Sequence, residues 1–284
     1  AHWSEHPDRD QVWADAEKAR IGDERFRREH ECEFLIFDET LINSIHLADM
    51  EGIAPVETTG QVRWFKKPTP GMTYMVSLDP AMGTGGDFAA IQVFELPTFE
   101  QVGEWHHNQT PMNQQIRILQ GINKHLHDSI MEQDASATPQ IFYSMENNTI
   151  GEAALLRVMD IGEENIQGMF LSEPIRKGHR RKFRRGFNTT AKHKIDACTK
   201  FKELIENGKM KINSQLLISE LKDFVASGLS FKAKPGQHDD LVSSCLLMTR
   251  MMKVLADFDP KIFEKWTDRT SELTPMPIFG TFNG

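Results

Sequence analysis

The sequence predicts an α/β fold in which a mixed β-sheet is flanked by helices, with a short helical segment at the N-terminus. Three apolar, β-rich segments follow one another from Thr73, joined by connections too short to hold helices. Helical and strand patterns then alternate along the chain, as in α/β domains. A wholly parallel sheet is disfavoured, because parallel neighbours need a crossover of about a dozen residues or more.

Composition narrows the class of protein further. The chain has 284 residues, of which 39% are hydrophobic, so it is long enough to bury a sizeable core. No apolar run approaches the ~18 residues of a membrane span, and no N-terminal signal pattern is present. The three cysteines lack C-x-x-C spacing, which favours reduced thiols over disulfides or a cysteine zinc site. We therefore expect a cytoplasmic protein that is neither secreted nor membrane-bound.

The N-terminal segment shows helical spacing of small and apolar residues over 10–20, and Gly22 is a plausible end of that helix. A second helical stretch is expected over 23–32. Proline and glycine recur through 52–70, which predicts an irregular boundary. The expected division has three parts: 1–65, 66–257 and a C-terminal tail at 258–284.

The main domain alternates strands and helices in order. Strands are expected at 73–78, 88–95, 101–107, 140–146 and 167–171. Helices are expected at 112–128, 151–160, 190–207, 215–226 and 238–255. The third of these helices is followed by Gly208, a residue typical of the position just past a helix end.

Acidic residues stand at the ends of three of these elements. Asp79 closes the first strand, Glu146 closes the fourth, and Asp239-Asp240 open the last helix. Converging carboxylates repel one another unless hard cations such as Mg²⁺ or Mn²⁺ neutralise them. Two such ions about 3.5–4 Å apart stabilise the attacking and leaving oxygens in phosphodiester cleavage. Taken singly, Asp79 is better explained as a turn residue and the aspartate pair as a helix cap. The strand-terminal position of both Asp79 and Glu146 brings the two interpretations level, so both stay open. His238, beside that pair, is a candidate for a supporting contact.

The net charge of -8 argues at first against a nucleic-acid partner. However, residues 1–51 hold fourteen acidic and six basic residues, whereas the remaining 233 residues hold 27 of each sign. Within that neutral remainder, the segment 176–194 has nine cations and no acid, interleaved with Phe183 and Phe187. This basic segment favours contact with DNA phosphates over the alternative, an exposed loop without a ligand. Its cations are Arg176, Lys177, Arg180, Arg181, Lys182, Arg184, Arg185, Lys192 and Lys194.

Four short motifs stand out in order along the chain, namely Met75 to Ala90, Ser144 to Asn148, Gly186 to Thr190 and Gly236 to Val242. Together they resemble the C-terminal nuclease domain of the large terminase subunit of tailed double-stranded DNA bacteriophages. The N-terminal segment resembles the part that joins motor and nuclease in those proteins. The resemblance implies an RNase H-like (integrase/resolvase-like) fold, with a connector from the motor (ATPase) region over 1–65 and the nuclease domain over 66–257.

The same resemblance implies a metal-dependent endonuclease that cuts concatemeric double-stranded viral DNA by a mechanism using two Mg²⁺ or Mn²⁺ ions. Asp79 then matches the first catalytic aspartate and Glu146 the acid of the middle strand. Asp240, with Asp239 as the alternative, matches the acid of the last helix, and Asp87 matches a further acid after the glycine-rich turn. Implied partners are the terminase ATPase domain, the portal protein and the small terminase subunit, at the procapsid in the host cytoplasm.

One departure from the family stands out, because no lysine of this chain is followed by Ser or Thr and the P-loop sequence is therefore absent. We expect no ATP site in this chain and hence no motor part, as in a fragment of a longer protein. Two alternatives remain open. One is a related nuclease of the Holliday-junction resolvase or transposase type, and the other is a non-catalytic module that binds DNA or docks on the motor.

Overall fold

The computed structural model describes residues 3–22, 26, 30–31, 39–174 and 185–258. Its centre is a seven-stranded mixed sheet with the order β1-β2-β5-β4-β3-β6-β7. The pairs β3–β6 and β6–β7 are parallel, and the other neighbours are antiparallel. The strands are β1 Glu57–Thr59, β2 Val62–Trp64, β3 Thr73–Asp79, β4 Ala89–Leu96, β5 Glu100–His107, β6 Gln140–Met145 and β7 Met169–Phe170. The mixed α/β architecture predicted from the sequence is confirmed.

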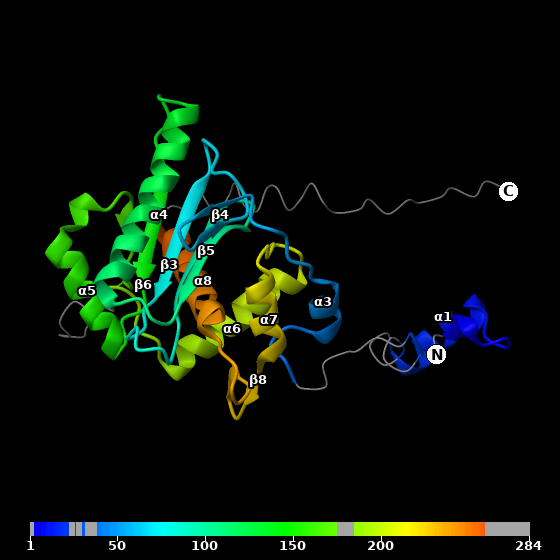
Figure 1. The fold of residues 1–284 in the computed structure, drawn as a ribbon. Helices are drawn as coiled ribbons and strands as arrows, with labels where there is room; N and C mark the ends of the chain where they lie inside the picture. Colours follow the sequence, from blue (N-terminus) through cyan, green and yellow to red (C-terminus); the bar gives the residue numbers. More distant parts are fainter. Residues whose placement is uncertain (1–2, 23–25, 27–29, 32–38, 175–184, 259–284) are drawn as a thin grey trace.

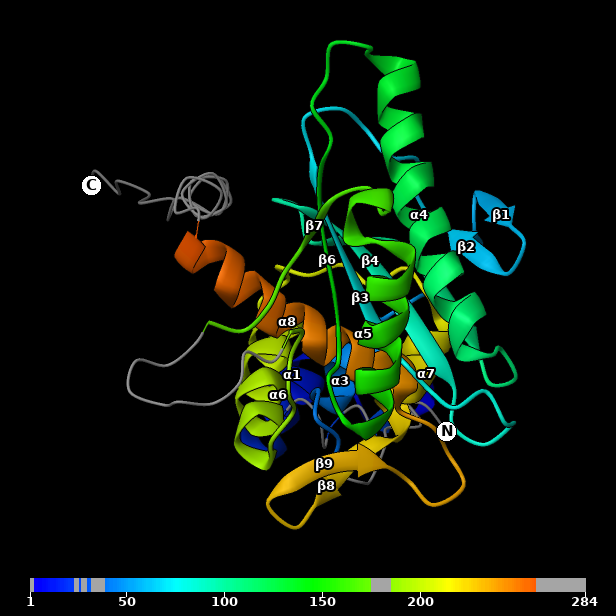
Figure 2. The same cartoon turned by 90° about the vertical axis from the view of Figure 1, so that its left-hand side faces the viewer.

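Helices cover both faces of this sheet. The helix α8 lies against one face together with α6 and α7, whereas α4 and α5 cover the other (Figures 1 and 2). A separate two-stranded sheet, β8 Phe224–Ser227 and β9 Ser230–Ala233, precedes α8. The α-helices are α1 Gln11–Ile21, α3 Ser44–Asp49, α4 Met112–Gln133, α5 Thr149–Ile161, α6 Ala191–Glu206, α7 Gln215–Asp223 and α8 Asp240–Phe258. Short 3-10 turns are η1 Trp3–Glu5 and η2 Glu163–Asn165.

The five predicted strands and the helix over 10–20 are present within one or two residues of their expected bounds. Most of the second expected helix, over 23–32, lies outside the described residues. The segment 52–70, expected to be irregular, contains the β1–β2 hairpin, whose second strand pairs with β5. The sheet therefore begins earlier in the chain than the proline and glycine spacing indicated.

The helix expected over 215–226 is shorter than predicted, because α7 ends at Asp223 and β8 begins at the next residue. Phe224 is fully buried, its carbonyl accepts a hydrogen bond from the amide of Leu41 at 3.0 Å, and it pairs with Ala233 of β9. Ala233 belongs to the adjoining strand of a hairpin, but Leu41 is distant in sequence. Tertiary pairing therefore overrides the local helical pattern at this point.

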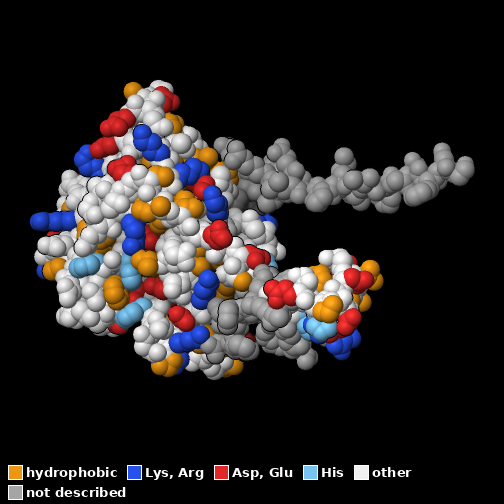
Figure 3. Space-filling view, turned by 45° about the vertical axis from the view of Figure 1, so that its right-hand side comes forward, with side chains coloured by type: hydrophobic (Ala, Val, Ile, Leu, Met, Phe, Trp, Pro, Cys, Tyr) orange, Lys and Arg blue, Asp and Glu red, His pale blue; other side chains and the backbone are white. Residues whose placement is uncertain are grey.

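Surface charge in the described region is mixed in sign. On the face that Figure 3 presents, acidic and basic side chains are interspersed over the molecule. This agrees with the equal numbers of acidic and basic residues beyond residue 51. Among the helices of the described region, none combines the length and apolar character needed to span a membrane.

The two-residue alternation of β3 decides which face its terminal acid occupies. Val76 and Leu78 belong to the core under α4 and α5, while Met75 belongs to the core under α8. Ser77 also faces α8, where its hydroxyl donates to the carbonyl of Ser244 at 2.8 Å. Asp79 is two residues further on, so strand alternation directs it to the same face as α8.

The buried pair of serines ties α8 to the middle of the sheet. While the Ser77 hydroxyl donates to the Ser244 carbonyl, the Ser244 hydroxyl donates to the Ser77 carbonyl at 3.0 Å. Both side chains are completely buried. A buried hydroxyl of this kind stabilises the fold only while its partners remain.

We predict that Ser244→Ala lowers the free energy of unfolding by about 1–2 kcal/mol, because the buried Ser77 carbonyl loses the hydroxyl that donates to it. The Ser77 hydroxyl keeps the Ser244 carbonyl as its acceptor but loses its 2.9 Å contact with the Ser244 hydroxyl. Urea denaturation followed by circular dichroism measures the change. The matched control is Ser243→Ala, the same exchange at the neighbouring position of α8, which should alter stability by less than about 0.5 kcal/mol. Equal effects of the two substitutions would show that the serine pair does not hold the helix.

Candidate functional site

The acids at the ends of β3 and β6 lie side by side. These strands are parallel and in register, with Leu78 opposite Met145, and the amide of Glu146 donates to the Leu78 carbonyl at 3.0 Å. Asp79 and Glu146 therefore follow the last pair of the ladder at the same sheet edge. Their carboxyl groups are close enough that the negative charge of Glu146 raises the pKa of Asp79 beyond the effect of burial.

Asp239 and Asp240, at the start of α8, approach the same edge. Each of the two contacts a different part of the backbone. The Asp239 carbonyl accepts from the amide of Ser243 at 2.7 Å, which places Asp239 at the helix cap and Asp240 at the first helical residue. Asp240 accepts from the amide of Phe88, just before β4, at 3.3 Å. Asp239 instead accepts from the amide of Ala233 in β9 at 3.2 Å.

The electrostatics of this edge reflect crowding of negative charge. Burial raises the pKa of Asp79 well above its usual range, and the charges of Glu146, Asp240 and Asp239 raise it further, in that order. Asp79 is nevertheless partly exposed to solvent, so protein atoms surround its carboxyl group closely but do not enclose it completely. Burial also raises the pKa of Asp240 to about 6, helped by Asp239 and opposed by the Phe88 amide.

Two predicted supporting residues also lie near Asp240. Asp87, which is exposed, adds a smaller repulsion that raises the pKa of Asp240. The Nδ1 atom of His238 lies 3.6 Å from Asp240 Oδ2, and its ring meets Phe88 edge-on at 4.8 Å between centroids. The structure thus brings both predicted supporting residues to the acid of the last helix.

Glu220 of α7 is a further acid at this edge, and sequence reasoning missed it. Its Oε2 atom accepts from the amide of Val242 at 3.1 Å, so it caps the first turn of α8 from another helix. Burial raises the pKa of Glu220 to about 9, and the charges of Asp240 and Asp239 contribute. Within its own helix Glu220 is an ordinary polar residue, so no local pattern signals it.

His106 lies 3.8 Å from Glu220 and stacks on Phe88 with ring centroids 4.1 Å apart. Burial lowers the pKa of His106 to about 4. Since the pKa of Glu220 is about 9, both groups are neutral at pH 7. They therefore form a neutral contact behind Phe88, and not an ion pair.

The carboxyl oxygens of these four acids suit a hard divalent cation, although their side chains are not arranged as the ligands of a bound ion. Four carboxyl groups within electrostatic range supply only oxygen donors, the type that Mg²⁺ and Mn²⁺ prefer. No group of three His, Cys, Asp or Glu residues is already arranged to hold a metal in the part of the chain described.

The basic segment is only partly described. Arg185 forms an ion pair with Glu163 and its guanidinium lies over the Phe170 ring at 5.5 Å, so its charge is already engaged. Lys194 lies 3.9 Å from Asp239, and Lys192 is exposed near the start of α6. The others fall outside the described residues, namely Arg176, Lys177, Arg180, Arg181, Lys182 and Arg184.

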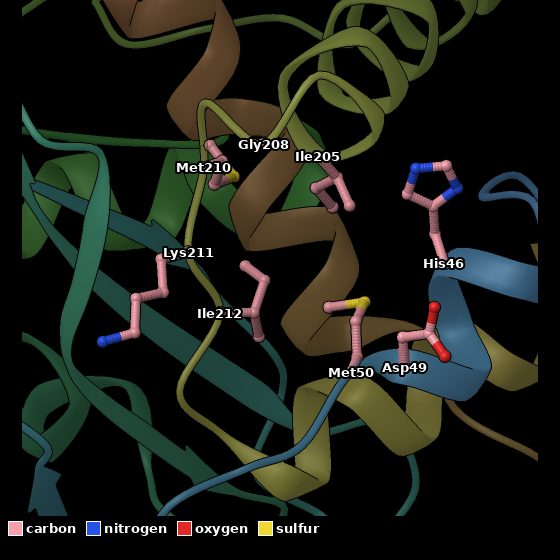
Figure 4. A pocket seen from close by; sticks show the side chains of 8 residues that line it. All are labelled: His46, Asp49, Met50, Ile205, Gly208, Met210, Lys211 and Ile212. Carbon is pink, nitrogen blue, oxygen red and sulfur yellow. The ribbon is translucent and has the colours of Figure 1, made fainter. Parts of the chain in front are cut away.

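A pocket of about 400 Å³ lies between α3, the end of α6 and the segment after it, lined by residues that include His46, Met50 and Ile212 (Figure 4). The neighbouring Lys211 pairs with Glu100, the first residue of β5. The acids lie beside the opposite end of that strand. This pocket is therefore remote from the acidic edge and adds nothing to it.

The fold and the acidic edge together define an RNase H-like α/β domain with converging carboxylates. Residues 76–251 match the model of the terminase RNase H-like domain family. Since this match spans more than half of the 284 residues, the chain belongs to the family of terminase RNase H-like domains. The resemblance to the nuclease part of a large terminase subunit, stated from the sequence motifs, is confirmed.

Solved structures agree in fold. The large terminase nuclease from thermophilic phage G20c, in crystals with bound magnesium and with bound cobalt, gives a TM-score of 0.55 at 16% identity in each case. Each comparison covers 75% of this chain and 97% of that one. A further structure of the same nuclease gives a TM-score of 0.54 at 18% identity, covering 74% and 96%. At such identities the likeness concerns the fold.

We predict that Asp79→Asn stabilises the metal-free protein at about pH 8 by about 1 kcal/mol, because it replaces a carboxyl group whose pKa is raised in the folded state by burial and by the charges of Glu146, Asp240 and Asp239. The folded-state pKa of Asp79 is raised, so the parent's free energy of unfolding falls as the pH rises through that pKa. The gain should therefore shrink at about pH 4, where the parent carboxyl is protonated. Urea denaturation in EDTA measures both values.

The matched control is Asp196→Asn, the same exchange at an exposed position of α6. It should change the unfolding free energy by less than about 0.5 kcal/mol at either pH. A loss of stability in Asp79→Asn at about pH 8 would contradict the repulsion described for this edge.

Proposed function

We propose that this chain is a metal-dependent endonuclease that cuts double-stranded viral DNA during genome packaging. The observation that carries the proposal is the convergence of Asp79, Glu146 and Asp240 at one sheet edge in a member of the terminase RNase H-like family. No other part of the described chain combines acids from three separate elements with this degree of mutual repulsion.

In this proposal, Asp79, Glu146 and Asp240 hold two divalent cations, with Asp79 shared because it faces the other two. Bound Mg²⁺ or Mn²⁺ would stabilise the charge that develops on the phosphate oxygens during phosphodiester cleavage. The magnesium- and cobalt-bound forms of the phage G20c nuclease support a divalent ion at this type of fold. Asp239, which faces β9 and Lys194, is the alternative to Asp240, and Asp87 and His238 support the site.

DNA would contact the face from which these acids are reached. The basic segment supplies the positive charge that a phosphate backbone requires, and neither base reading nor a fixed sequence is needed for such contact. Lys192 is exposed and close in sequence to Lys194, whose ammonium group already lies beside Asp239. The short distance between Lys194 and Asp239 supports the proposal that DNA held by the basic segment reaches the acidic edge.

The family suggests the setting in which cleavage would occur. Concatemeric DNA would be cut at the procapsid in the host cytoplasm, in an assembly with the terminase ATPase domain, the portal protein and the small terminase subunit. Residues 1–65 would serve as the connector to the motor, and 66–257 as the nuclease domain. In this division the β1–β2 hairpin lies at the junction of the two parts.

We predict that Asp79→Ala reduces plasmid cleavage in Mn²⁺ or Mg²⁺ by at least about 100-fold, because it removes the carboxylate shared by both ions. Conversion of supercoiled plasmid to open and linear forms, followed on agarose gels, measures the rate. Asp196→Ala, at an exposed position of α6, is the control and should cut like the parent. Undiminished cutting by Asp79→Ala would remove this residue from the site.

We predict that replacing Arg180 and Arg181 together with Ala weakens binding to duplex DNA of any sequence. Each lost phosphate contact should reduce the slope of log affinity against log salt by about 0.9, so the pair reduces it by about 2. Fluorescence anisotropy across a salt series measures the slope. Lys253→Ala, an exposed cation near the end of α8, is the control. An unchanged slope for the double variant would exclude these two residues from the DNA interface.

A further inference from the structure

Asn148 makes two kinds of hydrogen bond at the start of α5. Its Oδ1 atom accepts from the amides of Ile150 at 3.1 Å and Gly151 at 3.0 Å, so the side chain caps the helix. Its Nδ2 atom donates to Glu146 Oε2 at 3.1 Å. Because an oxygen must face the two amide donors, the capping bonds also decide that the NH₂ group faces Glu146.

The backbone holds these groups at short range. The carbonyl oxygen of Glu146 lies so close to Gly151 that a Cβ atom there would be 1.9 Å from it. A side chain at this position is sterically excluded, and the first turn of α5 can therefore press against the Glu146 backbone. On the other side, the amide of Asn147 donates to the Phe187 carbonyl at 2.7 Å. The peptide that carries Glu146 is thus held between α5 and Phe187, which lies within the basic segment 176–194.

We infer that Asn148 is a positioning residue for Glu146, holding one carboxyl oxygen so that the group presents its other oxygen in a constant orientation. The inference rests on the proposed function, since it gives Glu146 the task of holding a cation. Groups that hydrogen-bond to a metal ligand commonly alter metal affinity by about 10–100-fold when removed. A residue that only capped α5 would have no such effect.

The two tasks of Asn148 can be separated by substitution. Serine is about as good a helix cap as asparagine, because its hydroxyl oxygen accepts from the same amides. It lacks the NH₂ group that reaches Glu146. Asn148→Ser therefore keeps the cap and removes the contact with the acid, and Asn148→Thr does the same with a second side chain.

The control is the same exchange at another helix cap. Asn43 caps α3, where its Oδ1 atom accepts from the amide of Ile45 at 2.8 Å. It lies at the α3 end of the molecule, near Glu206, which accepts from its amide at 2.7 Å. Asn43→Ser therefore repeats the chemical change without touching the acidic edge.

The experiment measures Mn²⁺ binding by isothermal titration calorimetry, thermal unfolding without metal, and DNA cleavage across a Mn²⁺ series. For Asn148→Ser and Asn148→Thr we expect melting temperatures within about 2 °C of the parent. The Mn²⁺ dissociation constant should rise by about 10-fold. Cleavage should fall at limiting Mn²⁺ and return toward the parent rate at saturating Mn²⁺. Asn43→Ser should match the parent in Mn²⁺ affinity and cleavage.

Unchanged Mn²⁺ affinity in both Asn148 variants would overturn the inference and leave Asn148 as a helix cap alone. A parent chain that binds Mn²⁺ but leaves DNA intact would contradict the proposed nuclease function, while the affinity comparison would still decide the role of Asn148. A parent chain that binds no Mn²⁺ would overturn both.

Discussion

Mutual repulsion among carboxylates at one edge of the sheet is the constraint around which this domain is organised. Asp79 and Glu146 reach that edge because two parallel strands end in register, and Asp240 reaches it because α8 begins there. Burial raises the pKa values of Asp79 and Asp240, and the charges of the neighbouring carboxylates raise them further. Folding brings these charges together, so the rest of the fold must hold them in place against their own repulsion.

Several contacts supply that restraint. The reciprocal bonds between Ser77 and Ser244 fasten α8 to the centre of β3, only two residues before Asp79. The amide of Phe88 faces Asp240, and Glu220 caps the first turn of the helix that carries it. At Glu146, the close approach of Gly151 presses α5 against the backbone. Each acid thus lies on a regular element whose own packing is independent of the acids, which is what a precise cation site requires.

Whether a feature of the fold or of the site could be predicted from the sequence depends on whether neighbouring residues or residues distant in the chain determine it. Asp79 and Glu146 could be identified because each ends an apolar strand, and local alternation assigns such a residue to a face. Glu220 could not, because it becomes part of the edge only when α7 packs beside α8. The pairing of Arg185 with Glu163 was equally hidden, since it depends on where the chain returns after α5. Likewise, the first residues of β8 were taken for helix, because their backbone contacts with Thr40 and Leu41 are distant in sequence.

The central claim is that the acidic edge is a cation site, and a crystal structure of the chain soaked in Mn²⁺ tests it most directly. Anomalous diffraction at the manganese absorption edge locates the ions without reference to activity. The account predicts ions shared by the carboxylates of Asp79, Glu146 and Asp240, the acids that repel one another at this edge without metal. A soaked crystal in which no anomalous peak lies within bonding distance of Asp79 would contradict it.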